Sequence, residues 1–186
     1  MSKREKGFTL IELMVSLVVV GILLLVAVPN FGSFVAQSRV DSVKNKLVSS
    51  IALARSEAIK RGVAVAICRK NPDPAQTCVG TAVTGSKDWS DGWLVFLDED
   101  DNQTAAAAEI IKVYADIDDA STIQYSLGDV IVFDGLGLLG TASSSEEEFA
   151  IGDTADPTIG AGLSIRPTGR IRTCVNWTVS AATCGD

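Results

Sequence analysis

The stretch Lys6-Gly7-Phe8-Thr9-Leu10-Ile11-Glu12 leads directly into an apolar run that ends just before Pro29. This run, residues 8–28, contains 21 residues. As a helix it would be about 31 Å long, which is close to the hydrocarbon thickness of a bilayer. We therefore predict a membrane-spanning helix over residues 8–28, with the basic residues that precede it on the cytoplasmic side.

One residue in this run is unusual for a lipid environment. Glu12 lies four residues inside the apolar stretch. An ionised carboxylate there costs about 2.5–3.5 kcal/mol on insertion scales, so it requires either a partner or a route to the interface. Ionisable residues inside membrane spans commonly mark functional sites. Glu12 is therefore the first candidate functional residue of the chain.

The N-terminus resembles the class III signal of type IV pilins and type II secretion pseudopilins. The residues that carry the resemblance follow a short basic leader and are Gly7, Phe8, Thr9, Leu10, Glu12 and Pro29. The resemblance implies that a prepilin peptidase removes residues 1–7 by cutting after Gly7 and then methylates Phe8. It also implies that Glu12 pairs with the N-terminal ammonium group of a neighbouring subunit and sets the register during assembly.

Two simpler interpretations explain less of the N-terminus. A cleaved secretory signal peptide would have a shorter apolar region and small residues before its cleavage site, whereas a site at Ala36 has the bulky Phe34 two positions earlier. A plain signal anchor would explain the apolar run and its basic flank. It would not explain the Gly7-Phe8 pair or the acid at Glu12.

The segment after Pro29 predicts an amphipathic continuation of the helix. Its apolar residues recur at intervals of four and three, which places them on one face that would lie against a sheet. These residues are Ala36, Val40, Val43, Leu47, Ile51, Ala54 and Ala58. Arg61 suits the negative end of a helix, and Gly62 suits its left-handed closing position. We predict an amphipathic helix over residues 29–61 and a globular domain over residues 62–186.

The globular domain has the pattern of strands separated by turns. Five short runs are rich in β-branched or aromatic residues, namely 63–67, 92–97, 110–114, 130–133 and 162–166. They predict one antiparallel sheet packed on the helix, an α+β architecture. Residues 142–156 contain three successive serines and three successive glutamates, and this polarity predicts an exposed loop.

Four cysteines are present, at positions 68, 78, 174 and 184. The predicted topology places them outside the cytoplasm, where disulfides persist, and four cysteines allow three connectivities. Neighbouring cysteines are ten residues apart with turn-forming or small residues between them, which favours the local pairs Cys68–Cys78 and Cys174–Cys184. Free buried thiols are the alternative. Zinc binding is disfavoured because CxxC spacing and histidine are both absent.

The composition argues against an enzyme. The chain contains no histidine, so Ser-His-Asp and Cys-His catalysis and histidine-ligated metal sites are impossible within it. No P-loop or GxGxxG sequence follows a strand-like run. We predict no catalytic residues, no cofactor and no metal site.

One acidic segment has a partial calcium-loop pattern. Asp98, Asp100 and Asn102 alternate as calcium ligands do, and Glu109 falls at the twelfth position. The sixth position is Gln103 instead of glycine, and the preceding segment has the pattern of a strand instead of a helix. These two differences favour a solvated acidic turn over a calcium site.

A second resemblance covers most of the chain and concerns the GspH/FimT/FimU family of minor pilins. It is carried by residues 54–58, 65–68, 89–98 and 169–172. It implies the type IV pilin fold and a low-copy subunit that primes pilus assembly near the fibre tip, with its globular domain outside the bacterial inner membrane. The implied partners are minor and major pilins and the inner-membrane assembly platform. The terminal cysteine loop and the GRxR pattern favour a type IV pilus, and a structural pseudopilin of type II secretion is the alternative.

The GRxR pattern, residues 169–172, yields the candidate binding site. In one strand Arg170 and Arg172 would share a face, and Arg166 would join them unless Pro167 or Gly169 bends the chain. Guanidinium groups match phosphate oxygens. In FimT-like members the motif is associated with DNA binding during natural transformation, so the resemblance implies contact with double-stranded DNA.

The charge of the domain opposes this role. From residue 63 onward the chain contains seven Lys and Arg residues against nineteen Asp and Glu residues. Non-specific DNA affinity depends on neutralising phosphates, so such an acidic domain needs a local basic patch. The last 25 residues contain three arginines and one acid, so basic character is concentrated there. The alternative is that these arginines pair with acids of this subunit or of the next pilin.

Overall fold

The computed structural model describes residues 7–72, 77–79, 87–115, 117–140 and 146–174, without the side chains of residues 25–30 and 87. The chain divides into two compact units, residues 1–35 and 36–186. Helix α1 (Leu10–Arg61) supplies residues to both. No helix in the described part of the chain combines the length and the apolar character needed to cross a membrane.

Helix α1 ends where the sequence predicts. Gly62 adopts a φ of +70°, and its amide donates a 2.8 Å hydrogen bond to the carbonyl oxygen of Ala58. Glu57 pairs with Arg61 at 2.7 Å and with Lys60 at 3.5 Å, which places both cations in the last turn. A left-handed glycine and basic side chains at the negative end of the helix together explain this boundary.

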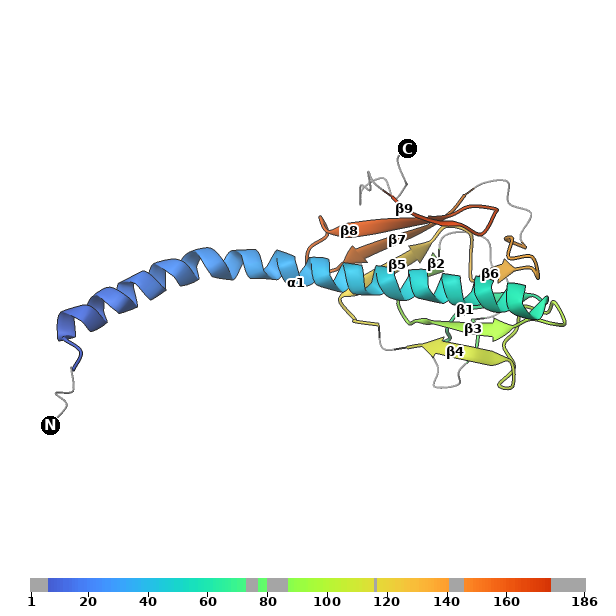
Figure 1. Cartoon of the computed structure of the whole chain (residues 1–186), viewed down its shortest axis with the longest axis horizontal. Coiled ribbons are helices and arrows are strands. Elements are labelled where there is room, and N and C mark those ends of the chain that lie inside the picture. The colour runs from blue at the N-terminus through green and yellow to red at the C-terminus, as the bar shows by residue number, and fades with distance from the viewer. Residues whose placement is uncertain (1–6, 73–76, 80–86, 116, 141–145, 175–186) are drawn as a thin grey trace, which may run out of the picture. The chain divides into compact units, whose positions relative to one another are not determined.

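The described residues of the globular unit form two antiparallel sheets instead of the single sheet expected. The first has the strand order β4-β3-β1-β6, with β1 (Val65–Arg69), β3 (Trp93–Leu97), β4 (Ile110–Tyr114) and β6 (Val130–Phe133). The second has the order β2-β5-β7-β8-β9, with β2 (Lys87–Asp88), β5 (Ser121–Tyr125), β7 (Glu147–Asp153), β8 (Gly160–Ile165) and β9 (Ile171–Thr173). Within the unit, residues 36–61 of α1 run across both sheets (Figure 1).

The main core lies between the helix and the inner faces of both sheets. Every residue of the predicted helix stripe is buried, from Ala36 to Ala58. Trp89 contacts Tyr125 and Phe149 edge-on, with ring centroids 5.4 and 5.3 Å apart. The α+β prediction is therefore confirmed, and the apolar stripe on the helix is what joins the two sheets into one core.

The prediction of an exposed loop over residues 142–156 is wrong. Residues 147–153 form β7, an inner strand that pairs with both β5 and β8. Its side chains alternate between buried and half-buried, and Phe149 and Ile151 enter the core. The polar composition of the stretch concealed a regular alternation of period two. Residues 142–145 lie outside the described part of the chain.

The alternation of β7 also buries a carboxylate. Glu147 is 1% exposed and accepts a hydrogen bond from the Tyr125 hydroxyl of the neighbouring strand. Burial, and then the adjacent Glu147 carboxylate, raises the pKa of Tyr125. The acid thus has a hydrogen-bonding partner inside the core, which makes its burial possible.

Candidate functional site

The N-terminal candidate residues surround the start of α1. Gly7 and Phe8 precede the helix, and the Phe8 side chain is 81% exposed. Thr9 acts as the N-cap, because its Oγ1 accepts a 3.3 Å hydrogen bond from the amide of Glu12. Glu12 therefore lies in the first turn of the helix, where its negative charge is favourable even without a partner subunit.

The second candidate site is the hairpin formed by β8 and β9, which we call the arginine hairpin (residues 164–172). The chain reverses between Arg166 and Arg170, with a 3.0 Å hydrogen bond from the Arg166 amide to the Arg170 carbonyl oxygen. Gly169 makes this turn with a φ of +72°. The chain therefore bends at residues 167–169. The sequence left open whether a bend at Pro167 or Gly169 would place Arg166 on a different face from Arg170 and Arg172.

The three arginines nevertheless share one face, because the hairpin returns them to it. Ile165 lies opposite Ile171, and Ser164 lies opposite Arg172. Cross-strand neighbours have their side chains on the same side of a sheet. Since Ile165 enters the core, its neighbours Ser164 and Arg166 have their side chains on the opposite face of the sheet. Arg166, Arg170 and Arg172 line one pocket with a volume of about 170 Å³.

Among the residues that the structure describes, one acid contacts this arginine cluster. Glu146 pairs through Oε1 with Arg166 Nε at 3.0 Å and accepts a 2.5 Å hydrogen bond from Ser164 Oγ through Oε2. The Ser164 hydroxyl, followed by the nearby guanidinium groups of Arg166 and Arg172, lowers the pKa of Glu146. Within the described residues, the guanidinium groups of Arg170 and Arg172 make no hydrogen bond or ion pair, whereas their backbones belong to the hairpin. Their donors are therefore accessible to an anionic ligand.

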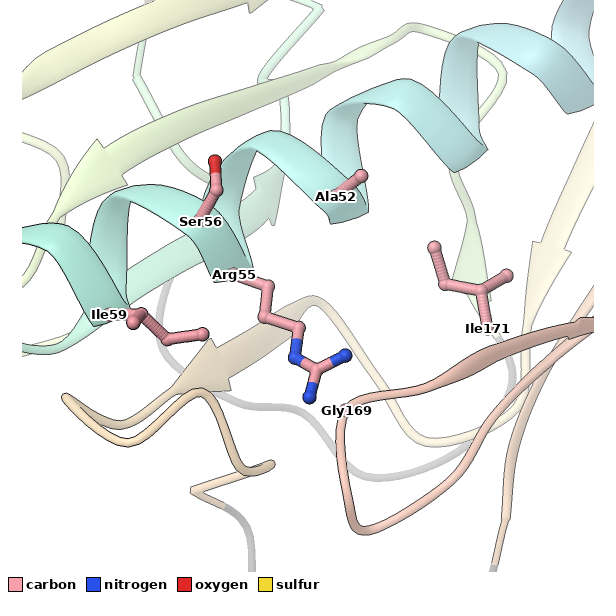
Figure 2. Close-up of a pocket in the computed structure, with 6 residues that line it drawn as sticks. All are labelled: Ala52, Arg55, Ser56, Ile59, Gly169 and Ile171. Atoms are coloured by element: carbon pink, nitrogen blue, oxygen red, sulfur yellow. The ribbon is translucent and has the colours of Figure 1, made fainter.

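Arg55, which is not among the predicted site residues, supports the arginine hairpin from the side of α1. Arg55 on α1 donates through Nε to the carbonyl oxygen of Gly137 at 3.1 Å, and a Cβ on Gly169 would lie only 3.0 Å from Arg55 Nε. Figure 2 shows the Arg55 side chain extending from the helix towards the turn that carries Gly169. It lines a largely apolar pocket of about 260 Å³ together with Ile59, Ile171 and others. The only sequence signal was its place among residues 54–58.

The first predicted disulfide is present. Cys68 in β1 is bonded to Cys78, with Cα atoms 5.6 Å apart. An antiparallel bridge between Lys70 and Cys78 folds the closed loop back on the end of β1. Cys184 lies outside the described residues, so the pair Cys174–Cys184 stays a prediction.

The acidic segment after β3 is not the fully solvated turn expected. Asp98 is 1% exposed, and its Oδ1 accepts a 3.0 Å hydrogen bond from the amide of Gln103. Burial raises the pKa of Asp98. Asp101 and Gln103 adopt positive φ values of 55° and 56°, so the loop turns sharply without a glycine. Among the described residues, no group of three or more Asp, Glu or Cys side chains is placed to hold a metal ion.

Two family models match the chain. The one described as type II transport protein GspH matches residues 44–180. The one described as the prokaryotic N-terminal methylation motif matches residues 2–28. The first covers both sheets and the arginine hairpin, and the second covers the N-terminal candidate residues.

Similar proteins are found among curated pilins, mostly through partial matches. The type IV major pilin protein PilA of Myxococcus xanthus is 48% identical over 44 residues, which are 24% of this chain and 20% of that protein. A fimbrial protein of Pseudomonas aeruginosa is 33% identical over 78 residues, covering 42% of this chain and 49% of that protein. The chain thus matches a fifth of the first relative and about half of the second.

One solved structure shows the same fold. The crystal structure of the type IV minor pilin FimU of Pseudomonas aeruginosa superposes with a TM-score of 0.55 and 21% sequence identity, covering 77% of this chain and 92% of that chain. A second crystal form of FimU gives a TM-score of 0.52. The predicted type IV pilin fold, a long N-terminal helix packed on antiparallel sheets, is therefore confirmed.

Proposed function

This chain belongs to the GspH family of type II transport proteins, and on that premise we propose that it is a minor type IV pilin whose arginine hairpin binds double-stranded DNA. Prepilin peptidase cuts after Gly7 and methylates Phe8, and the product stays in the bacterial inner membrane until it enters a pilus. The inner-membrane assembly platform is a further partner during this step. In the pilus the chain associates with other minor and major pilins and helps to prime or cap the fibre. Its role is structural and binding, without catalysis.

The N-terminal segment supports the assembly part of this proposal. The methylation-motif match includes Gly7, Phe8 and Glu12. The large apolar side chains described between Phe8 and Leu24 are all at least half exposed in the isolated chain. Such a surface requires an apolar environment, either lipid or the helices of neighbouring pilins. We assign residues 8–28 to the lipid bilayer before assembly and to contacts with neighbouring pilin helices in the fibre.

The grouping of Arg166, Arg170 and Arg172 around one pocket is the observation that carries the DNA-binding part. Arginine offers a planar fork of donors that matches phosphate oxygens, and contacts of this kind hold the DNA backbone without reading its sequence. The surrounding domain is acidic, so we expect weak binding, in the non-specific range of about 10⁻⁴ to 10⁻⁶ M.

The test uses the full-length chain in a nonionic detergent and labelled duplexes of unrelated sequence at low salt. We expect weak binding to every duplex and a loss of affinity as salt rises. Replacing Arg170 and Arg172 with Gln should remove most of the binding. Replacing Lys70 and Lys112 with Gln changes the net charge equally in the first sheet, at the end of β1 and in β4, and should have little effect. No binding at high protein concentration, or equal binding by the Arg170/Arg172 variant, would contradict the proposal.

The second candidate is a minor pseudopilin of a type II secretion system with a purely structural role. The description of the matching family as a type II transport protein favours it, and so does the excess of nineteen acids over seven bases from residue 63 onward. In this case Arg170 and Arg172 would pair with acids of the next subunit. The DNA-binding experiment distinguishes the two candidates, because only the pilin candidate binds DNA through these arginines.

A further inference from the structure

The arginine hairpin already holds one anionic group, the carboxylate of Glu146. Its two oxygens have separate donors, Arg166 Nε at 3.0 Å and Ser164 Oγ at 2.5 Å. Arg172 lies opposite Ser164 in the hairpin register. The carboxylate is therefore held by a hydroxyl and a guanidinium, with a second guanidinium nearby, and these donor types also suit a phosphate group.

The position of Glu146 in the chain explains how it reaches this place. It immediately precedes β7, whose first residue, Glu147, pairs with Ile165. The side chain of Glu147 enters the core, so the side chain of Glu146 is free to reach over the outer face towards Ser164. Ser164 itself is fully buried. Its hydroxyl already donates to the Glu146 carboxylate, so a phosphate that accepts from Ser164 must first replace that carboxylate.

We propose that Glu146 occupies the position that a DNA phosphate takes when the arginine hairpin binds, and that it thereby limits the affinity of this site for DNA. The inference rests on the proposed DNA-binding function and adds its regulation by a residue of the same chain. The Arg166 side chain is paired with Glu146 in the free protein, whereas the side chains of Arg170 and Arg172 make no hydrogen bond or ion pair among the described residues. Binding thus begins at the two accessible arginines and exchanges the carboxylate for a phosphate at the third.

The exchange is feasible because the internal ion pair is exposed. The side chains of Arg166 and Glu146 are 47% and 38% exposed, and ion pairs in such positions are weak. A DNA strand presents several phosphates at once and also contacts Arg170 and Arg172. Each phosphate contact releases counterions, which the internal carboxylate cannot do. The polyanion therefore competes successfully, although it must displace one negative charge first.

The matched variants are Glu146→Gln and Asp119→Asn. Glutamine keeps an oxygen that accepts from Ser164 but removes the charge that pairs with Arg166. Asp119 is exposed and lies just before β5, whose residue Ser121 pairs with Asp153 at the end of β7 remote from Glu146. Its replacement makes the same change in net charge at the opposite end of the second sheet. The comparison separates occupation of the site from general repulsion by the acidic domain.

The experiment measures binding of labelled double-stranded DNA to the full-length chain in nonionic detergent at low salt. We expect Glu146→Gln to raise the affinity about three- to tenfold and Asp119→Asn to raise it less than twofold. In the Arg166→Gln background the gain from Glu146→Gln should disappear, because the released guanidinium is then absent. The inference would also be supported if the Glu146→Gln variant binds DNA while the wild-type chain does not, provided that this binding is lost in the Arg166→Gln background.

Two results would overturn it, and they differ in what they say of the proposed function. If the wild-type chain binds DNA through Arg170 and Arg172 but Glu146→Gln gains no more than Asp119→Asn, the inference is wrong and the DNA-binding function stands. If neither the wild-type chain nor Glu146→Gln binds DNA at high protein concentration, both fail. A circular dichroism spectrum and a thermal midpoint equal to those of the wild-type chain verify that each variant is folded.

Discussion

Arg55 and Gly137 are 82 residues apart in the sequence and are joined by a 3.1 Å hydrogen bond from the guanidinium Nε to the backbone carbonyl oxygen. The loop that contains Gly137 is in turn bonded to the arginine hairpin, since the amide of Leu139 donates to the carbonyl oxygen of Pro167 at 3.0 Å. Helix α1, this loop and the hairpin turn are therefore connected by two hydrogen bonds, one from the Arg55 side chain and one between the Leu139 and Pro167 backbones.

Replacing Arg55 with Ala should lower the free energy of unfolding by about 1–2 kcal/mol, because the Gly137 carbonyl loses its donor and the turn loses the packing of the arginine stem. Arg61→Ala is a suitable control. Arg61 is on the same helix but, among the described residues, its side chain pairs only with Glu57 one turn earlier, so its loss should cost about 0.5 kcal/mol or less. Urea denaturation monitored by tryptophan fluorescence measures both, and equal losses would contradict the connecting role of Arg55.

Gly169→Ala should destabilise the fold more than Gly62→Ala. Both glycines have φ near +70°, which costs about 1 kcal/mol for a residue with a side chain. A Cβ at Gly169 would also lie 2.3 Å from the carbonyl oxygen of Gly137, whereas a Cβ at Gly62 meets nothing within 4 Å. We expect a difference of about 1–2 kcal/mol between the two variants in urea denaturation. Similar midpoints would show that the turn moves away from Gly137 at little cost.

Asp98→Asn should stabilise the domain at neutral pH by about 1 kcal/mol, because it removes a buried charge with an unsatisfied oxygen and keeps the acceptor for Gln103. Burial raises the pKa of Asp98 above its ordinary value of 3.8, so the folded state binds the proton more tightly than the unfolded state. The contribution of Asp98 to stability therefore falls as pH rises from about 3.8 through the folded pKa.

The measurement is the difference in free energy of unfolding between this variant and the wild-type chain, at pH 4 and at pH 7. The difference should grow in favour of Asp98→Asn towards pH 7. Using the difference cancels the opposite pH dependence of Asp41 and Glu57, whose carboxyl pKa values are lowered in the folded state. A constant difference between the two pH values would show that the buried carboxyl does not titrate in this range.

Replacing Cys68 and Cys78 together with Ala should lower the free energy of unfolding by about 2–3 kcal/mol, as expected for closing a loop of this length. Peptide mapping under non-reducing conditions should recover Cys68 joined to Cys78, as in the structure, and Cys174 joined to Cys184. Detection of Cys68 or Cys78 in a peptide with either C-terminal cysteine would contradict the second pairing.

Gly7→Val should block maturation, because the scissile bond follows this residue. Glu12→Ala should allow cleavage but reduce incorporation into the fibre, since it removes the charge assigned to subunit pairing and leaves the cleavage site intact. The mass of the membrane form measures cleavage, and the amount of protein in sheared fibres measures incorporation. A wild-type membrane form that still carries residues 1–7 would contradict the pilin assignment.

The arginines of the cluster were predictable from the sequence, but the residues that contact and support them were not. The sequence identified Arg166, Arg170 and Arg172 and raised the possibility of a bend near Gly169. It did not indicate Glu146, because that residue lies 20 positions before Arg166 in a stretch that resembles a loop in composition. The role of Arg55 was not predictable either. An arginine beside the apolar stripe of an amphipathic helix cannot be distinguished from a solvent-exposed one until the position of the loop with Gly137 is known.

The sequence by itself determined the features that depend on neighbours within a few residues. These are the N-terminal signal around Gly7, the apolar stripe of the helix with its end at Gly62, the strands made of continuous apolar runs, and the local disulfide from Cys68 to Cys78. The periodicities of helices and strands repeat every few residues, so they can be recognised from the order of the amino acids alone. Tertiary structure alone decided the second sheet, in which Glu147 is buried because Tyr125 lies beside it. It also decided the pairing of Glu146 with Arg166 and the support of the hairpin by Arg55, because each depends on contacts between segments that only the folded chain brings together.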